Sequence, residues 1–255
     1  MVVLKDADSV GEGRTAKDFL ELLGSFDYPK EKMSVTVLTS STSEFEVVKK
    51  HFKKQIEWYS RLSVLFRNDL RSQMSSREKI AMTMKYRNFA LLSAWSSGTS
   101  MLCGWMQTCT GFPGLDIVEP MCVRMKANGK DWYEYDLNAW VGQRKVRRSA
   151  RDSNFVPGDS SVKRMKQFYG KEETFVPLDS VGGTMLYVKA DVHRQGVIFP
   201  VHHLIGSEWT SEGYDGIETE GLCYIAHFLG SSAGNAQRPY LPHITQKGAA
   251  SASKQ

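Results

Sequence analysis

In the N-terminal part of the chain, apolar positions change from strand spacing to helix spacing and back. Residues 2–4 are apolar and predict the end of a first strand, and residues 15–23 carry an apolar stripe at helical spacing that stops at Gly24. Residues 33–38 alternate and are rich in β-branched side chains, which predicts a second strand. The order is therefore strand, helix, strand.

The pattern continues with two further helices. Ser41, followed three residues later by Glu44, has the form of a capping box and predicts the start of a helix. Apolar residues near helical spacing predict a longer helix from Ser76 to Trp95. Alternating strands and helices favour an α/β fold with a parallel sheet wrapped by helices, in which ligands bind at the carboxyl ends of strands.

In the second half of the chain the pattern predicts one more strand and one more helix. Residues 181–189 resemble a strand entered through a glycine pair, which serves either a close backbone approach or a plain bulge. Residues 217–229 predict a helix with an acidic first turn, as the helix dipole favours. From residue 231 to residue 255 the composition predicts a disordered tail.

Composition fits one ordinary globular domain and leaves several alternatives open. The 255 residues are 41% hydrophobic and 24% charged, and a net charge of +5 is too small to indicate nucleic-acid binding by itself. The basic residues of 144–151 fit a solvated loop or an anion-binding patch. No apolar run approaches the length of a membrane helix, and the apolar start at residues 2–4 leads us to expect further sequence upstream.

Few side chains form a recognisable chemical motif. Cys103 and Cys109 are six apart, which is not a paired zinc spacing, and the adjacent His202 and His203 would point in opposite directions on a strand. Residues 135–140, YDLNAW, combine aromatic rings with an acid and an amide, which suits a polyhydroxylated ligand or an Asx turn equally. Glu218 and Glu220, two apart at the start of the 217–229 helix, fit capping alone or one capping group and one functional carboxylate.

Six segments together carry a resemblance to a known family. They read LKDADSVGEGRTAKDFLELLGSFDYP, KYRNFALLSA, DIVEPMCVRM, YDLNAW, VPLDSVGGTMLYVKADVHRQGVIFP and IETEGL, and they occur in the order typical of the fungal Golgi mannosyltransferases of glycosyltransferase family 62. The resemblance covers residues 1–230 and excludes residues 231–255. It implies a GT-A fold with a central mixed sheet flanked by helices, incomplete in this chain. It also implies GDP-mannose as donor, Mn²⁺ as cofactor, and retaining α-mannosyl transfer in mannan synthesis.

One stretch departs from the family pattern. In resembling sequences an Asp-x-Asp motif follows the helix that contains RNFALLSA and binds the metal, but here residues 100–109, SMLCGWMQTC, occupy that place. Reading the codons of residues 101–109 from the third base of the Met codon permits Ala-Leu-Trp-Leu-Asp-Ala-Asp-Val. We therefore interpret residues 97–114 as out of frame, with a natural divergent insertion as the alternative. Without the motif we expect little or no catalysis, because metal assistance stabilises the charge on a leaving diphosphate.

The resemblance also implies roles for individual residues. It places Arg87 and Asn88 beside the nucleotide, with Lys5 and Asp6 near the guanosine, and a guanidinium suits phosphate because its fork donates two parallel hydrogen bonds. The implied catalytic acids are Asp136, Glu220 and, as second choice, Glu218. The implied substrate-binding residues are Asn138, Asp179, Gly182 and Gly183.

Two functions of different kinds follow. The first is a mannosyltransferase of cell-wall mannan or N-glycan outer chains, on the lumenal side of the Golgi membrane, and the sequence as given leads us to expect no membrane anchor within it. The second is a non-catalytic scaffold subunit of a mannan polymerase complex. The expected partners are a mannan or N-glycan acceptor and other mannosyltransferase subunits, and no nucleic acid is expected.

Overall fold

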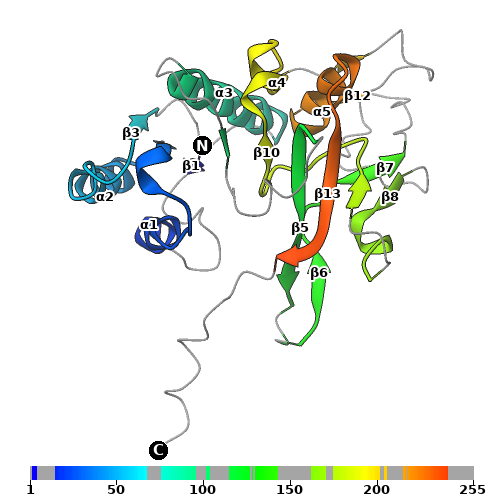
Figure 1. Ribbon diagram of the computed structural model, residues 1–255, viewed down its shortest axis with the longest axis horizontal. Helices are drawn as coiled ribbons and strands as arrows, with labels where there is room; N and C mark the ends of the chain where they lie inside the picture. The colour runs from blue at the N-terminus through cyan, green and yellow to red at the C-terminus, as the bar shows by residue number, and fades with distance from the viewer. Residues whose placement is uncertain are drawn as a thin grey trace, which may run out of the picture.

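The structure is a computed structural model with two main sheets and a long helix between them (Figure 1). It describes residues 2–4, 15–67, 76–95, 102–103, 115–126, 128, 130–142, 162–170, 175–201, 204–205, 215–216 and 218–240.

The first sheet contains three parallel strands in the order β1-β2-β3. Its elements are β1 (Val2–Leu4), α1 (Ala16–Gly24), η1 (Lys30–Lys32), β2 (Ser34–Thr39), α2 (Thr42–Lys53) and β3 (Arg61–Phe66). The predicted strand-helix-strand order is confirmed. Ser41 caps α2 as predicted, but the Glu44 carboxylate binds the Thr39 hydroxyl at 2.6 Å and does not close the box on Ser41.

Strand β2 is buried on both faces because helices cover each side. Val35 and Val37 face a core that contains Leu20 of α1 and Val48 of α2. Leu38, on the opposite face, packs in a separate cluster with residues of the next helix. This alternation explains why the strand reads as nearly continuous apolar sequence.

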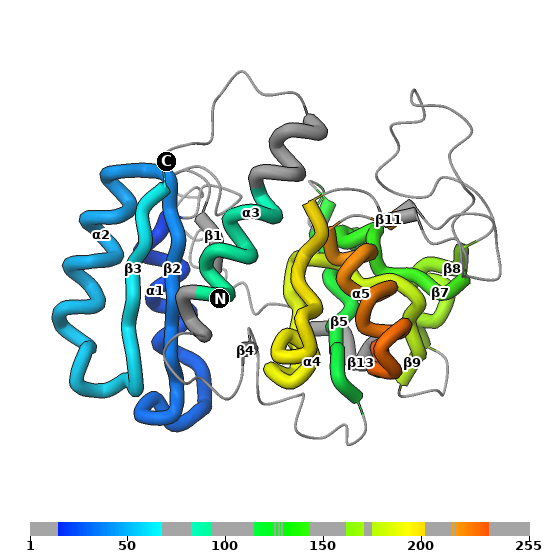
Figure 2. The backbone as a smooth tube through the Cα atoms, turned by 90° about the horizontal axis from the view of Figure 1, so that it is seen from above, coloured from blue at the N-terminus to red at the C-terminus, as the bar shows by residue number. Residues whose placement is uncertain are grey.

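Helix α3 (Ser76–Trp95), whose bounds match the prediction, lies between the two sheets (Figure 2). Tyr86 and Ala90 pack against Leu38 of the first sheet. Met84 lies in the core of the second half of the chain. Helix α3 therefore contributes side chains to the cores on both sides of it.

The second sheet is mixed and has the strand order β4-β10-β5-β13-β9, with β6 paired to β5. Only the β5–β13 pair is parallel. Helices α4 and α5 lie beside it (Figure 1). The elements of this half are β4 (Leu102–Cys103), β5 (Ile117–Met125), β6 (Trp132–Glu134), β7 (Trp140–Gly142), β8 (Val162–Arg164), η2 (Met165–Gln167), β9 (Phe175–Pro177), β10 (Tyr187–Val188), α4 (Ala190–Arg194), β11 (Leu204–Ile205), β12 (Asp215–Gly216), α5 (Glu218–Phe228) and β13 (Ala233–Tyr240).

The prediction of a disordered tail from residue 231 is wrong for residues 233–240. These residues form β13, which lies inside the second sheet between β5 and β9. The polar composition of this segment gave no sign of a strand. The strand forms because its backbone pairs with the free N–H and C=O groups of the strands on each side, which does not require apolar side chains. Gly234 helps, since a Cβ there would lie 1.6 Å from the Phe175 ring. The sequence predicted that the sheet is incomplete, but this strand is present in it.

The predicted strand 181–189 is also corrected. Only Tyr187–Val188 forms a strand, β10, and the preceding residues follow an irregular path. The physical reason is that the backbone N–H groups of residues 182–184 donate to buried carboxyl groups of other elements and do not join a ladder. The glycine pair therefore marks a packed turn.

The fold class is confirmed: the protein is α/β, with a mixed sheet flanked by helices, in agreement with the expected GT-A type architecture. Among the described residues, no helix is both long enough and apolar enough to span a membrane.

Candidate functional site

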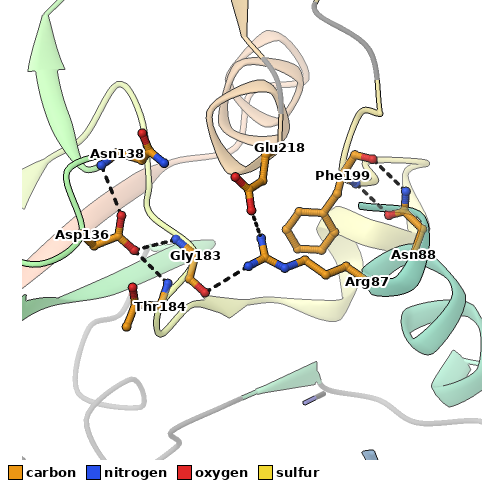
Figure 3. A network of polar contacts seen from close by, with 8 residues as sticks. All are labelled: Arg87, Asn88, Asp136, Asn138, Gly183, Thr184, Phe199 and Glu218. Atoms are coloured by element: carbon orange, nitrogen blue, oxygen red, sulfur yellow. Dashed lines mark hydrogen bonds and ion pairs between the residues drawn. The ribbon is translucent and has the colours of Figure 1, made fainter. Parts of the chain in front are cut away.

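Arg87 of α3 lies at the centre of a cluster in which its contacts come from the second half of the chain (Figure 3). Its Nη1 donates to the Glu218 Oε1 at 2.6 Å, and its Nη2 donates to the Gly183 carbonyl at 3.4 Å. The guanidinium carbon lies 5.5 Å from the centroid of the Phe199 ring. The guanidinium is therefore held by an acid, a carbonyl and an aromatic ring, and 19% of the side chain is exposed.

Glu218 begins α5 in an unusual backbone conformation. It is the one non-glycine residue with positive φ in the described part of the chain, at 61°, a strain of about 1–3 kcal/mol that surrounding contacts must hold. Its amide donates to the Pro200 carbonyl at 3.2 Å. Burial raises the pKa of the Glu218 carboxyl and the Asp136 charge adds to this, while Arg87 acts in the opposite direction.

Asp136 follows β6 and accepts backbone hydrogen bonds with both oxygens. Its Oδ2 accepts from the amides of Gly183 and Thr184, each at 2.8 Å, and its Oδ1 accepts from the Asn138 amide at 3.2 Å. The last contact is the Asx turn considered from the sequence. A Cβ on Gly182 would lie 2.1 Å from the Asp136 Cγ, so only glycine leaves room for this carboxylate.

The two glycines meet different partners. A Cβ on Gly183 would lie 2.8 Å from both terminal nitrogens of Arg87. Gly182 thus makes room for Asp136 and Gly183 makes room for Arg87. The turn places its backbone between the two side chains, and the close approach predicted for the glycine pair serves these contacts.

Glu119 is a residue of this cluster that sequence reasoning missed. It lies on β5, is 1% exposed, and accepts a short hydrogen bond from the Gly182 amide through Oε2, while Oε1 is buried without a hydrogen-bond partner. Burial raises the pKa of the Glu119 carboxyl well above its usual range, and the Asp136 charge raises it further. An acid inside the otherwise apolar start of β5 was the available signal.

Asn88, predicted beside the nucleotide, faces the main chain of Phe199. Its Nδ2 donates to the Phe199 carbonyl at 2.7 Å, and its Oδ1 accepts from the Phe199 amide at 3.0 Å. Both ends of the side-chain amide are thus occupied by one residue (Figure 3). Asn88 therefore holds the segment that presents the Phe199 ring to Arg87.

Three other predicted residues lie in different surroundings. Glu220 is buried and its Oε1 accepts from the Tyr224 hydroxyl at 2.8 Å, so the structure brings Glu218, not Glu220, to Arg87. Asp179 Oδ2 accepts from the Gly142 amide at 2.7 Å and ties β7 to the 178–180 segment. The Asn138 carbonyl accepts from Ser180, while its buried Oδ1 has no hydrogen-bond partner.

Several predictions fall outside the described residues. These are Lys5, Asp6, the basic segment 144–151, His202 and His203, and residues 100–109 apart from β4. The sequence does contain one Asp-x-Asp, Asp6-Ala7-Asp8, but it follows β1 and also lies outside the described part.

The described residues do not fit the divalent cation that the resemblance implies. Within them, no group of three or more His, Cys, Asp or Glu side chains could hold a metal ion. Both oxygens of Asp136 already accept main-chain N–H groups.

Comparison with known proteins gives a match to one family model and matches to two named proteins. Residues 113–203 match the family model described as Anp1. The mannan polymerase complex subunit mnn9 of Schizosaccharomyces pombe is 29% identical over 185 residues, which cover 64% of this chain and 51% of that protein. The mannan polymerase complex subunit MNN9 of Candida albicans is 36% identical over 110 residues, which cover 38% of this chain and 27% of that protein.

The chain thus spans about half the length, or less, of these two relatives. The matched range contains Glu119, Asp136 and the glycine pair, while Arg87 and Glu218 lie on either side of it. These matches confirm the resemblance to the fungal mannosyltransferases, and the similarity to the Anp1 family model covers residues 113–203.

Proposed function

We propose that the chain acts in mannan synthesis, with a site around Arg87 that binds the diphosphate of GDP-mannose. The observation that carries the proposal is the position of Arg87, whose part-buried guanidinium is held between Glu218, the Gly183 carbonyl and the Phe199 ring. A planar guanidinium binds phosphate oxygens through parallel hydrogen bonds, and partial burial strengthens the attraction.

The remaining residues of the cluster would shape the site. Asp136 fixes the 182–184 turn through two amides, and Asn88 fixes Phe199. In the proposed site both are positioning residues. Glu218 contacts Arg87 whereas Glu220 contacts Tyr224, so of these two acids Glu218 lies at the proposed anion site.

Transfer of mannose by this chain should be weak or absent. The place where the family carries its Asp-x-Asp is occupied by residues 100–109, which contain no acid. Metal assistance stabilises developing charge by several kcal/mol in such reactions, which corresponds to a rate loss of about a thousandfold or more. Mn²⁺, the cofactor that the resemblance implies, is therefore added in the activity assay, and no described residue is assigned to bind it.

A scaffold role in a mannan polymerase complex is the second candidate. It is favoured by the carboxyl groups of the cluster, since Asp136, Glu218 and Glu220 each already bind a group of the protein itself. The names of the two relatives describe subunits of such a complex. In this role the partners are other subunits of the complex. The complex would extend a mannan chain in the lumen of the Golgi.

Calorimetric titration with GDP-mannose tests the proposal. The full chain should bind it, and Arg87→Ala should weaken binding about 10- to 100-fold, because hydrogen bonds to charged groups contribute about 1.5–3 kcal/mol. Arg61→Ala is the matched control, since Arg61 is an exposed arginine on β3 that contacts Ser63. Equal binding by the wild type and Arg87→Ala would refute the proposed site.

An activity assay separates the two candidates. Purified chain is incubated with GDP-mannose, Mn²⁺ and an α-mannose oligosaccharide, and extension of the oligosaccharide is measured. Slow transfer that Arg87→Ala abolishes supports a weak enzyme. No transfer together with retained GDP-mannose binding supports the scaffold subunit, while rapid metal-dependent transfer contradicts the expected loss of activity.

A further inference from the structure

The Arg87–Glu218 contact has the geometry of an anion site that is already filled from within. Glu218 Oε1 lies 2.6 Å from the Arg87 Nη1, and the two side chains are only 13% and 19% exposed. Figure 3 shows the carboxylate pointing at the end of the guanidinium, with the Phe199 ring beside it. A carboxylate oxygen at this distance occupies the position that a phosphate oxygen would need.

The other contacts of Arg87 do not compete with an anion. Gly183 contributes a carbonyl, which can only accept a hydrogen bond, and the Phe199 ring contacts the guanidinium at 5.5 Å. An incoming phosphate would keep both contacts and replace only Glu218. Among the described residues, Glu218 is therefore the group that must move away before the Arg87 Nη1 can donate to an anion.

The backbone of Glu218 points to a role beyond filling space. A left-handed conformation is unfavourable for a residue with a Cβ, yet it occurs here at the first residue of α5, φ 61°, where the chain turns from Pro200 contact into the helix. Ordinary capping needs no such conformation and is served by short polar residues. The strain is concentrated at the residue that holds Arg87, and strained residues cluster at ligand-binding sites.

We infer that Glu218 is an affinity-determining residue that competes with the diphosphate of the substrate for Arg87. This inference rests on the proposed function, since it identifies the group that the diphosphate displaces. Glu218 keeps the guanidinium in place while the site is empty, and it sets how strongly an anion must bind in order to enter. Removing its charge therefore makes Arg87 a stronger anion receptor.

The test is calorimetric titration of the full chain with inorganic pyrophosphate and, separately, with GDP. Glu218→Gln should bind pyrophosphate about tenfold more tightly than the wild type, because a charged competitor has been replaced by a neutral one. Glu218→Asp retains the charge but withdraws it by one methylene, so its affinity should lie between the two. Asp191→Asn is the control for net charge, since Asp191 is an exposed acid paired with Arg194 on α4.

The outcomes separate this inference from the proposed function. If both Glu218 variants remain folded by circular dichroism and bind pyrophosphate no more tightly than the wild type, Glu218 does not compete and the inference is overturned. A purely structural role predicts weaker binding, because Arg87 would lose its orientation. Tighter pyrophosphate binding without any GDP binding supports the anion site but overturns the nucleotide assignment, and no binding of either ligand overturns both.

Discussion

Gly182→Ala should destabilise the protein strongly, through a clash that only the folded structure reveals. The new Cβ would lie 2.1 Å from the Asp136 Cγ and 2.3 Å from both carboxylate oxygens. Asp136 must move, and it then loses the hydrogen bonds from the Gly183 and Thr184 amides, each 2.8 Å long. Two bonds to a charged acceptor contribute about 3–6 kcal/mol together, a large part of the typical total stability of a domain.

Urea unfolding followed by circular dichroism measures this change. Gly24→Ala is the matched control, because Gly24 ends α1 with no atom near a new Cβ, and its stability should stay within about 1 kcal/mol of the wild type. On an Asp136→Ala background, Gly182→Ala should add little, because the atoms it would meet are gone. The reasoning fails if Gly182→Ala alone lowers the free energy of unfolding by less than about 1 kcal/mol.

Three further predictions concern buried polar groups. Burial raises the pKa of Glu119, so above pH 4.5 the carboxyl loses its proton in the unfolded chain before it does so in the folded one, and stability falls as pH rises. Urea unfolding of Glu119→Gln should therefore show a gain in stability relative to the wild type as pH rises from 4.5 to 8. Burial lowers the pKa of His193, so the contribution of the neutral side chain to the free energy of unfolding is lost as pH falls below 6.5. The free energy of unfolding of His193→Gln should therefore fall less than that of the wild type between pH 7.5 and 5.5. Asn88→Ala removes two hydrogen bonds to Phe199 and should lower the free energy of unfolding by about 1–3 kcal/mol, whereas an unchanged value would deny Asn88 its positioning role.

The first half of the fold could be predicted because its signals are local. The apolar stripe of α1 and the alternation of β2 express which faces are buried, and Ser41 marks the start of α2. The second half was less predictable because its strands depend on distant partners. The segment Ala233–Tyr240 has little β-forming character of its own and is ordered by pairing with β5 and β9.

The candidate site was predicted in part, and the departures have one cause. Arg87, Asp136, Gly183 and Glu218 were named from the sequence, and the structure brings them together. Their partners could not be inferred, because spacing along the chain does not show which backbone groups a side chain meets. Glu218 and Glu220 both lie in the first turn of α5, yet one faces Arg87 and the other faces Tyr224.

A continuous path of contacts links the centre of the second sheet to α3. Glu119 of β5 holds the Gly182 amide, Asp136 holds the next two amides, and the Gly183 carbonyl between them accepts from Arg87. A shift of the turn therefore moves the carbonyl that contacts the guanidinium. Because Glu119 and Asp136 hydrogen-bond to this backbone and not to Arg87, changes at either residue should alter anion affinity through the turn, while Glu218 remains the side chain that competes for Arg87. Substitution of Glu218 should instead remove that competition and leave the turn in place, so pyrophosphate affinity combined with unfolding free energy distinguishes the two kinds of residue.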